Sequence, residues 1–369
     1  MNKKVNTIVV KVGTSSITNK EGEIDKKSVS KLCEEVADLR AVGNKVVIVT
    51  SGAIAAGLPF LGLSGSKRPQ DSSTLQAISA VGQGSLIGIY REELSNFDLV
   101  AGQVLLAPLD FFVRSQYLHA RNTLTRLIDL DVIPVINEND AIADDEIRFG
   151  DNDRIAALVA HLVEADLLVL LTDTPGLFTA DPRIDSNASL IEEIIEIDQE
   201  LEKFAGISAS EFGSGGMASK LAAAKIASWS GVKTVIADAS RSKVLRDSCD
   251  GVSGIGTVVH ARKSRLGAKK LWIAFAVGSS GQVHVDKGAR RAVEKNHASL
   301  LPSGVIKVTG KFDQGDAVEI VDQEGSIFAK GIVRLDSTSI SLHAGLNTST
   351  LPDGISHEVV HADDLVVLP

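Results

Sequence analysis

Acids and amides cluster at two nearby places in the middle of the chain. The run Asn137-Glu138-Asn139-Asp140 directly follows an apolar segment, 132–136, and Gly150-Asp151-Asn152-Asp153 directly precedes an apolar helical pattern. A continuous apolar segment bounded by polar residues predicts a strand buried on both faces of a parallel sheet, and ligands collect beyond the carboxyl ends of such strands. Carboxylates and amides there suit a small polar ligand that carries an amine, or a metal with phosphate. An ordinary strand-to-helix loop with Asx turns and an N-cap is the alternative interpretation.

Two lysines stand beside glycines in positions that suit a phosphate. Lys11 lies at the exit of the first apolar segment and is followed by glycine and hydroxyl residues; Lys220 ends the run Gly213-Ser214-Gly215-Gly216-Met217-Ala218-Ser219-Lys220. Glycine lets the backbone approach a phosphate, and ammonium and N–H groups offset its charge. The second segment is not a Walker A loop, because Ser219 precedes the lysine and Leu221 follows it. The alternatives are a surface lysine for Lys11 and a flexible loop for the glycine run.

Polar residues also follow two further apolar segments. Ser51-Gly52-Ala53 comes after segment 45–50, and Ser51 could cap a helix whose N–H groups bind an anion. The same cap without a ligand is the simpler interpretation of this motif alone. Thr172-Asp173 stands ahead of a Pro-Gly turn, where it could shape a nucleotide pocket or serve only the turn.

Together these segments predict a phosphoryl-transfer site. Cations and N–H groups surround a transferring phosphate in such sites, and acids hold Mg²⁺ or orient the lysines. None of the eight histidines falls in these segments. A hydroxyl acceptor usually needs a base to take its proton, whereas a carboxylate is already ionised at neutral pH. The missing histidine therefore favours a carboxylate acceptor, although an aspartate could also serve as a base.

The elements that must position these residues alternate along the first part of the chain. Apolar strand patterns cover 7–12, 45–50, 100–106, 132–136, 167–172 and 233–237, and helical patterns cover 28–42, 76–94, 116–130, 155–165 and 217–230. Alternation of apolar strands with amphipathic helices predicts an α/β domain with three αβα layers around a mainly parallel sheet. We expect it to span residues 1–262.

The pattern changes after residue 262. Residues 263–270 belong to a basic stretch without a strong apolar pattern, and we expect them to form a linker. From 271 to 369 short strand-like segments are separated by turn signals such as Asp322-Gln323-Glu324-Gly325. Such a pattern predicts a small C-terminal β-barrel.

Composition narrows the class of protein. The chain has 369 residues and a net charge of −9, which argues against wholesale binding of nucleic acid or membranes. Its two cysteines, Cys33 and Cys249, lack metal-ligand spacing and indicate structural thiols in a reducing compartment. The N-terminal residues lack a secretory apolar core, and no apolar run approaches the ~20 residues of a membrane helix. We expect a cytoplasmic protein that does not enter a membrane.

In this order the motifs resemble those of the amino-acid kinase superfamily, and within it the glutamate 5-kinase family. The specific part is the pair Asn137–Asp140 and Gly150–Asp153; the lysine and Gly-Gly-Met segments are shared with carbamate, acetylglutamate and aspartate kinases. The tail from 271 resembles a PUA domain, a likeness carried by residues 283–289, 299–305 and 310–316.

The resemblance implies roles for individual residues. It implies that Lys11 and Lys220 contact the transferring phosphate and that Asp153 holds both lysines in place. It implies that the substrate amino acid is held by Ser51, by the N–H groups of Gly52 and Ala53, and by Asp140 and Asn152. It implies an ATP site lined by Lys11, Thr172, Asp173 and residues 214–220. Because the family binds Mg²⁺ largely through the nucleotide, we name no protein ligand for it.

The activity implied is ATP-dependent phosphorylation of the γ-carboxylate of L-glutamate to γ-glutamyl phosphate, the first step of proline biosynthesis. The resemblance also implies feedback inhibition by proline, and dimers or tetramers are common for such folds. The alternatives are a sister kinase that acts on acetylglutamate, aspartate or carbamate, or an RNA-binding regulator that acts through the PUA-like tail. The Asn137–Asp140 run and the tail disfavour the former, and the intact lysines disfavour the latter.

Overall fold

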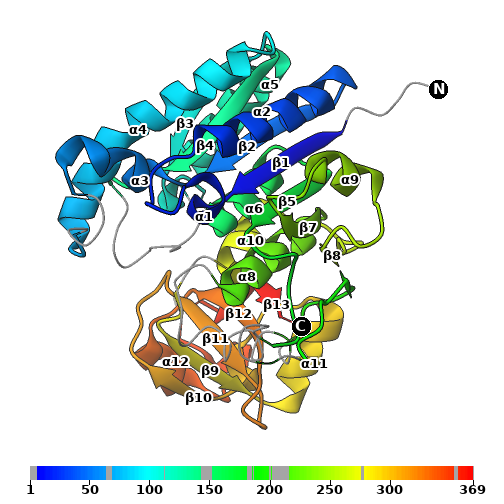
Figure 1. Ribbon diagram of the computed structural model, residues 1–369. Coiled ribbons are helices and arrows are strands. Elements are labelled where there is room, and N and C mark those ends of the chain that lie inside the picture. Colours follow the sequence, from blue (N-terminus) through cyan, green and yellow to red (C-terminus); the bar gives the residue numbers. More distant parts are fainter. Residues whose placement is uncertain are drawn as a thin grey trace. The chain divides into compact units, whose positions relative to one another are not determined.

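The computed structural model describes residues 6–63, 69–111, 113–142, 152–180, 185, 187–198, 201, 216–275, 278–352 and 356–368. The chain divides into two compact units, Met1–Arg265 and Leu266–Pro369, and each has its own sheet (Figure 1).

The described part of the first unit contains an eight-stranded sheet. Its strands in chain order are β1 (Thr7–Val12), β2 (Lys45–Thr50), β3 (Val100–Leu106), β4 (Val132–Glu138), β5 (Leu167–Thr172), β6 (Glu193–Ile194), β7 (Lys233–Asp238) and β8 (Thr257–Val259). In space the order is β3-β4-β2-β1-β5-β7-β8-β6, and neighbours run parallel except β7 and β8. The carboxyl ends of β1, β2, β4 and β5, where the candidate residues stand, therefore meet at one edge.

Helices cover both faces of this sheet. In chain order they are α1 (Thr14–Ile17), α2 (Lys26–Ala41), α3 (Ala53–Gly57), α4 (Ser72–Ser95), α5 (Arg114–Asp129), α6 (Asn152–Leu162), α8 (Met217–Trp229) and α9 (Val244–Asp250), with the 3-10 turns η1 (Pro59–Leu61) and η3 (Pro108–Phe111). Helices α2 and α4 begin at capping residues: the side chain of Asp25 accepts the N–H of Lys27, and that of Asp71 accepts the N–H of Thr74.

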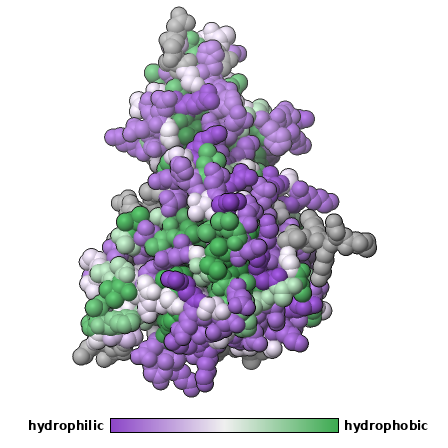
Figure 2. All heavy atoms as spheres, turned by 90° about the horizontal axis from the view of Figure 1, so that it is seen from above, coloured by the Kyte–Doolittle hydropathy of each residue, from purple (hydrophilic) through white to green (hydrophobic). Residues whose placement is uncertain are grey.

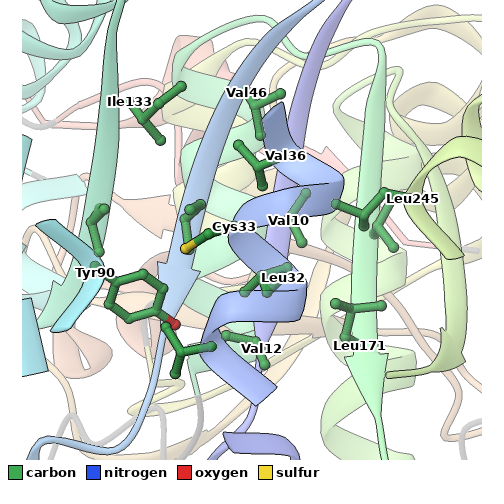
Figure 3. Close-up of a cluster of buried hydrophobic side chains, with 14 of the residues drawn as sticks. Val10, Val12, Leu32, Cys33, Val36, Val46, Tyr90, Ile133, Leu171 and Leu245 are labelled. Atoms are coloured by element: carbon green, nitrogen blue, oxygen red, sulfur yellow. The ribbon is translucent and has the colours of Figure 1, made fainter. Parts of the chain in front are cut away.

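One hydrophobic core joins α2, α4 and α9 to the sheet. Figure 3 shows Leu32, Cys33 and Val36 of α2 facing Val10 and Val12 of β1. Tyr90 of α4 and Leu245 of α9 extend the same cluster. On the opposite face α6 packs against β1 and α8, and α5 packs against β4. The predicted three-layer arrangement is confirmed.

Most predicted strand limits agree with the structure. The main difference concerns β4, which runs on to Glu138 instead of ending at Ile136, because Asn137 and Glu138 pair with Leu105 and Leu106 of β3. The first half of the polar cluster is thus strand and not loop. Strands β6 and β8 were not predicted, since two or three residues give too short a pattern.

The second unit is a small, mainly antiparallel sheet with the order β10-β9-β11-β12-β13. Its elements are α10 (Ala268–Phe275), β9 (Gly281–Val285), α11 (Lys287–Asn296), η5 (Pro302–Gly304), β10 (Val305–Gly310), β11 (Ala317–Val321), β12 (Ile327–Val333), α12 (Ser337–His343), η6 (Thr348–Thr350) and β13 (Val360–Val367). A bridge between Leu300, just ahead of β10, and Val360 of β13 curls the sheet towards closure. Helix α10 begins inside the predicted linker 263–270, because buried Leu271 and Ile273 give it an apolar face that the basic stretch conceals.

Both cysteines are poor nucleophiles. Burial raises the pKa of the Cys33 thiol to about 12 and that of Cys249 to about 11, so both are protonated at neutral pH. No helix among the described residues is long and apolar enough to span a membrane.

Candidate active site

A buried carboxylate joins the two lysines that the sequence singled out. Oδ1 of Asp153 lies 2.6 Å from Nζ of Lys11, and Oδ2 lies 3.3 Å from Nζ of Lys220. Asp153 is fully buried and Lys11 nearly so, while Lys220 is 12% exposed. The three residues come from α6, β1 and α8, which meet because α6 packs on both β1 and α8.

Two ammonium groups face one carboxylate in this cluster, those of Lys11 and Lys220 on either side of Asp153. The N-terminal turn of α8, which begins at Met217 and carries Lys220, adds its partial positive charge. This arrangement suits an anion such as a phosphate.

Asn152, the residue before Asp153, belongs to a second cluster. Its Nδ2 lies 2.7 Å from the carbonyl oxygen of Thr50, 3.0 Å from Oγ of Ser51 and 2.8 Å from Oδ1 of Asn137. Only 7% of Asn152 is exposed, yet its Oδ1 has no hydrogen-bond partner among the described residues. A buried acceptor without a partner costs free energy, so this oxygen is suited to a donor group on a ligand.

Ser51, Gly52 and Ala53 lie at the turn from β2 into α3. Gly52 has φ of 107°, a left-handed conformation that favours glycine, and it lets the chain turn sharply after the strand. The first N–H groups of α3 follow this turn. Ser51, just before the turn, lies beside Asn152, with Oγ of Ser51 at 3.0 Å from Nδ2 of Asn152.

Asp140 is the remaining residue predicted for the amino-acid substrate. One of its carboxylate oxygens accepts a 2.5 Å hydrogen bond from Oγ of Ser79, in α4. Nδ2 of Asn137 donates to Oε1 of Gln83, in the same helix, at 2.7 Å. Sequence reasoning named neither Ser79 nor Gln83, and it quoted Asn137 only as part of the motif. The position of Asn137 in that motif could have indicated it as a site residue. Nothing in the helical pattern of α4 indicated Ser79 or Gln83.

The predicted nucleotide residues lie at the end of β5. Oγ1 of Thr172 donates to Oδ1 of Asp173 at 3.1 Å. Both residues line a cavity of about 510 Å³ that opens between the carboxyl ends of β1, β5 and β7 and helix α2. Of the predicted glycine-rich segment, Gly216, Met217, Ala218, Ser219 and Lys220 are in place at the start of α8, and Ser214 and Gly215 lie outside the described residues. Oγ of Ser219 is buried and has no partner among the described residues.

Known families match each of the two units of the chain. Residues 6–238 match the amino acid kinase family, and residues 281–351 match the PUA domain. The chain belongs to the amino acid kinase family. The first match covers the lysine pair, the Asn152 cluster and every strand of the sheet except β8, and the PUA match falls in the second unit.

Curated relatives in the family resemble the chain along its whole length. The glutamate 5-kinase of Caldanaerobacter subterraneus subsp. tengcongensis is 43% identical over 365 residues, which cover 98% of this chain and 97% of that protein. The glutamate 5-kinase of Moorella thermoacetica is also 43% identical, with 98% and 96% covered, and that of Rhodococcus jostii is 44% identical, with 98% and 97% covered.

A solved structure shares the fold of the first unit. Carbamate kinase from Giardia lamblia, bound to AMP-PNP, aligns with a TM-score of 0.52 and 18% identity, and the alignment covers 70% of this chain and 99% of that one. At this identity the likeness supports the fold alone.

Proposed function

We propose that this chain transfers the γ-phosphoryl group of ATP to the γ-carboxylate of L-glutamate, giving γ-glutamyl phosphate and ADP, the first step of proline biosynthesis. The observation that carries the proposal is the position of two consecutive residues at the start of α6. Asn152 faces the Ser51 cluster, and Asp153 joins the lysines. A glutamate at the first cluster thus presents its carboxylate to a phosphate at the second, and the near-full-length likeness to glutamate 5-kinases supports the choice of substrate.

The lysine cluster is assigned to the transferring phosphate. Lys11 and Lys220 contact it and offset the charge that grows on its oxygens in the transition state. Asp153 holds both ammonium groups in place, which spares the reaction the cost of organising them. Since the acceptor is an ionised carboxylate, the step needs positioning and charge and no general base.

The Asn152 cluster is assigned to glutamate. Ser51, the N–H groups of Gly52 and Ala53, Asn152 and Asp140 hold the substrate. The Asp140 carboxylate pairs with the substrate ammonium, as a carboxylate near a fixed cation should. Oδ1 of Asn152, which has no hydrogen-bond partner among the described residues, accepts a further hydrogen bond from the substrate.

The nucleotide is assigned to Thr172, Asp173 and residues 214–220, together with Lys11. We propose Mg²⁺ as the metal that accompanies ATP. The one buried carboxylate beside the lysines is engaged by both of them, so the described residues suit a metal held mainly by phosphate oxygens. When bound, the metal would neutralise part of the charge on the phosphates.

Further features of the proposal concern regulation and assembly. We propose a cytoplasmic homo-oligomer, a dimer or a tetramer, that proline inhibits. Figure 2 shows the molecule from above relative to the view of Figure 1, with a green apolar patch on a largely purple, hydrophilic surface. Exposed apolar side chains on edge strand β3 and its flanking helices include Val81, Val100, Leu105 and Leu118. Apolar surface of this kind supports self-association.

An assay of ADP release tests the activity. Purified protein with ATP and Mg²⁺ is expected to release ADP only when glutamate is present, and added hydroxylamine should trap the acyl phosphate as a hydroxamate. A panel of acetylglutamate, aspartate and carbamate under the same conditions tests the substrate. No release above the glutamate-free control, or faster turnover of another member of the panel, would refute the proposal.

A further inference from the structure

Helix α4 carries three polar side chains on the face that meets the predicted acceptor residues. Ser79, Gln83 and Tyr90 stand one and then two helical turns apart, so they share a face, and we call them the polar stripe. Ser79 is 4% exposed and Tyr90 is fully buried. Each reaches a different part of the acceptor cluster, although none has a role in the proposed function.

Ser79 fixes the carboxylate of Asp140. Its hydroxyl donates to Oδ2 at 2.5 Å, and a hydrogen bond to an ionised oxygen is stronger and more directional than one between neutral groups. Asp140 follows the end of β4, beyond the sheet pairing that holds Asn137 and Glu138. Helix α4 therefore contacts the carboxylate of Asp140, which lies beyond the β3–β4 pairing.

Gln83 sets the direction of the Asn137 amide. Oε1 of Gln83 accepts from Nδ2 of Asn137 at 2.7 Å, which turns Oδ1 of Asn137 towards Nδ2 of Asn152 at 2.8 Å. A carboxamide has one donor end and one acceptor end, so fixing the first also fixes the second. Gln83 and Asn137 therefore help to orient the amide of Asn152, together with Thr50 and Ser51.

Tyr90 supports the end of β2. Its hydroxyl lies 2.8 Å from Oγ1 of Thr50, and Thr50 donates its own proton to the carbonyl oxygen of Ser51 at 2.9 Å. The phenol therefore donates. Burial raises the pKa of Tyr90 above its ordinary value, so the donor stays protonated.

A close contact between glycines holds α4 against α3. A Cβ on Gly82 would lie 1.9 Å from the carbonyl oxygen of Ala53 and 2.4 Å from the nitrogen of Gly57, so no other residue fits there without a shift of backbone. Helix α3 begins directly after Ser51-Gly52. The same contact thus sets the distance between the polar stripe and the Ser51 turn.

We propose that α4 is a positioning element of the acceptor site, and that Ser79 orients Asp140 for the substrate ammonium. The inference rests on the proposed function, because that function assigns the ammonium to Asp140. Ser79, Gln83 and Tyr90 contact protein groups, so they are positioning residues and not catalytic ones. The chemistry they serve is recognition of a small amino acid that carries a free ammonium group.

Ser79→Ala tests the inference. The change removes one oxygen and leaves a good helix former, so the fold is retained. We expect the KM for glutamate to rise about ten-fold, as loss of a hydrogen bond to a charged group implies, with the KM for ATP unchanged. Ser95→Ala is the matched control, because Ser95 is exposed on the same helix and its hydroxyl donates only to the carbonyl oxygen of Glu92.

A double-mutant cycle separates positioning from a general structural effect. In an Asp140→Ala background, Ser79→Ala should raise the glutamate KM no further, since its partner is gone. Gln83→Met, which keeps the length and removes the acceptor, should raise the same KM by itself. An unchanged glutamate KM in Ser79→Ala, equal rises in both KM values, or independent effects in the cycle would overturn the inference. Wild-type protein inactive with glutamate would instead refute the proposed function, and the inference would fall with it.

Discussion

Asn152 and Asp153 are neighbours in the chain, and their side chains enter two different clusters. The amide of Asn152 lies 3.0 Å from Oγ of Ser51, and the carboxylate of Asp153 lies 2.6 Å from Nζ of Lys11. Successive residues at the start of a helix point about 100° apart, so one short segment can serve two ligands. In the proposed function this segment sets the distance between glutamate and the phosphate.

Lys220→Ala should lower kcat about a hundred-fold or more, because one of the two cations that offset transition-state charge is lost. Steady-state ADP release measures the effect. Lys233→Ala is the control, since Lys233 begins β7 at the opposite edge of the sheet. A variant with a near wild-type rate would contradict the role given to Lys220.

Asp140→Ala should raise the KM for glutamate far more than the KM for ATP. The variant loses the carboxylate that pairs with the substrate ammonium, and the nucleotide residues at the end of β5 are untouched. Titration of each substrate at saturating levels of the other separates the two values. Asp129→Ala, at the surface end of α5, should change neither, and a parallel rise of both in Asp140→Ala would count against the assignment.

Asp153→Asn should cost both stability and activity. The substitution keeps the shape but leaves two ammonium groups without their carboxylate, and breaking a buried ion pair costs about 3–5 kcal/mol. Thermal denaturation should show a Tm several degrees lower. Asp131→Asn is the control, because Asp131 is 85% exposed in its pair with Arg40. Equal Tm values for wild type and Asp153→Asn would show that the carboxylate does not hold the lysines.

His161 should make the fold sensitive to acid. Burial, with Arg265 and Arg121 nearby, lowers its pKa from 6.5 to about 4. Its folded pKa lies below the unfolded one, so the stability it contributes is present above pH 6.5 and is lost as pH falls towards 4. By pH 5 the loss is about 2 kcal/mol, at about 1.4 kcal/mol per pH unit.

Denaturant unfolding at pH 7 and pH 5 measures this loss. The decrease in the free energy of unfolding from pH 7 to pH 5 should be smaller in His161→Gln than in wild type. Replacement of His119, which is exposed on α5, should leave this decrease as large as in wild type. An identical pH dependence in wild type and His161→Gln would refute the role of His161.

The sequence predicted the sheet well for a physical reason, whereas the contact of Asp153 with both lysines was implied by the family resemblance. Strands buried on both faces leave long apolar runs in the sequence, and parallel strands bring their carboxyl ends to one edge of the sheet. Because Lys11, Ser51, Asp140 and Thr172 stand at or just beyond the ends of such runs, the sequence alone predicted that they lie at that edge. Local pattern does not report side-chain partners across the fold. Ser79 and Tyr90 looked like ordinary positions of α4, because their contacts with Asp140 and Thr50 depend on how α4 packs. Helix α11 was missed because its apolar face is short and most of its side chains are polar.

The most direct measurement of the central claim follows one oxygen atom. In the proposed reaction a γ-carboxylate oxygen of glutamate attacks the γ-phosphorus of ATP and becomes the bridging oxygen of the acyl phosphate. Hydroxylamine then attacks the carbonyl carbon and expels phosphate with that oxygen attached. With glutamate that carries heavy oxygen in its γ-carboxylate, mass spectrometry should find one heavy oxygen in each phosphate released. Phosphate without heavy oxygen would mean that the carboxylate is not the acceptor, and would contradict the account.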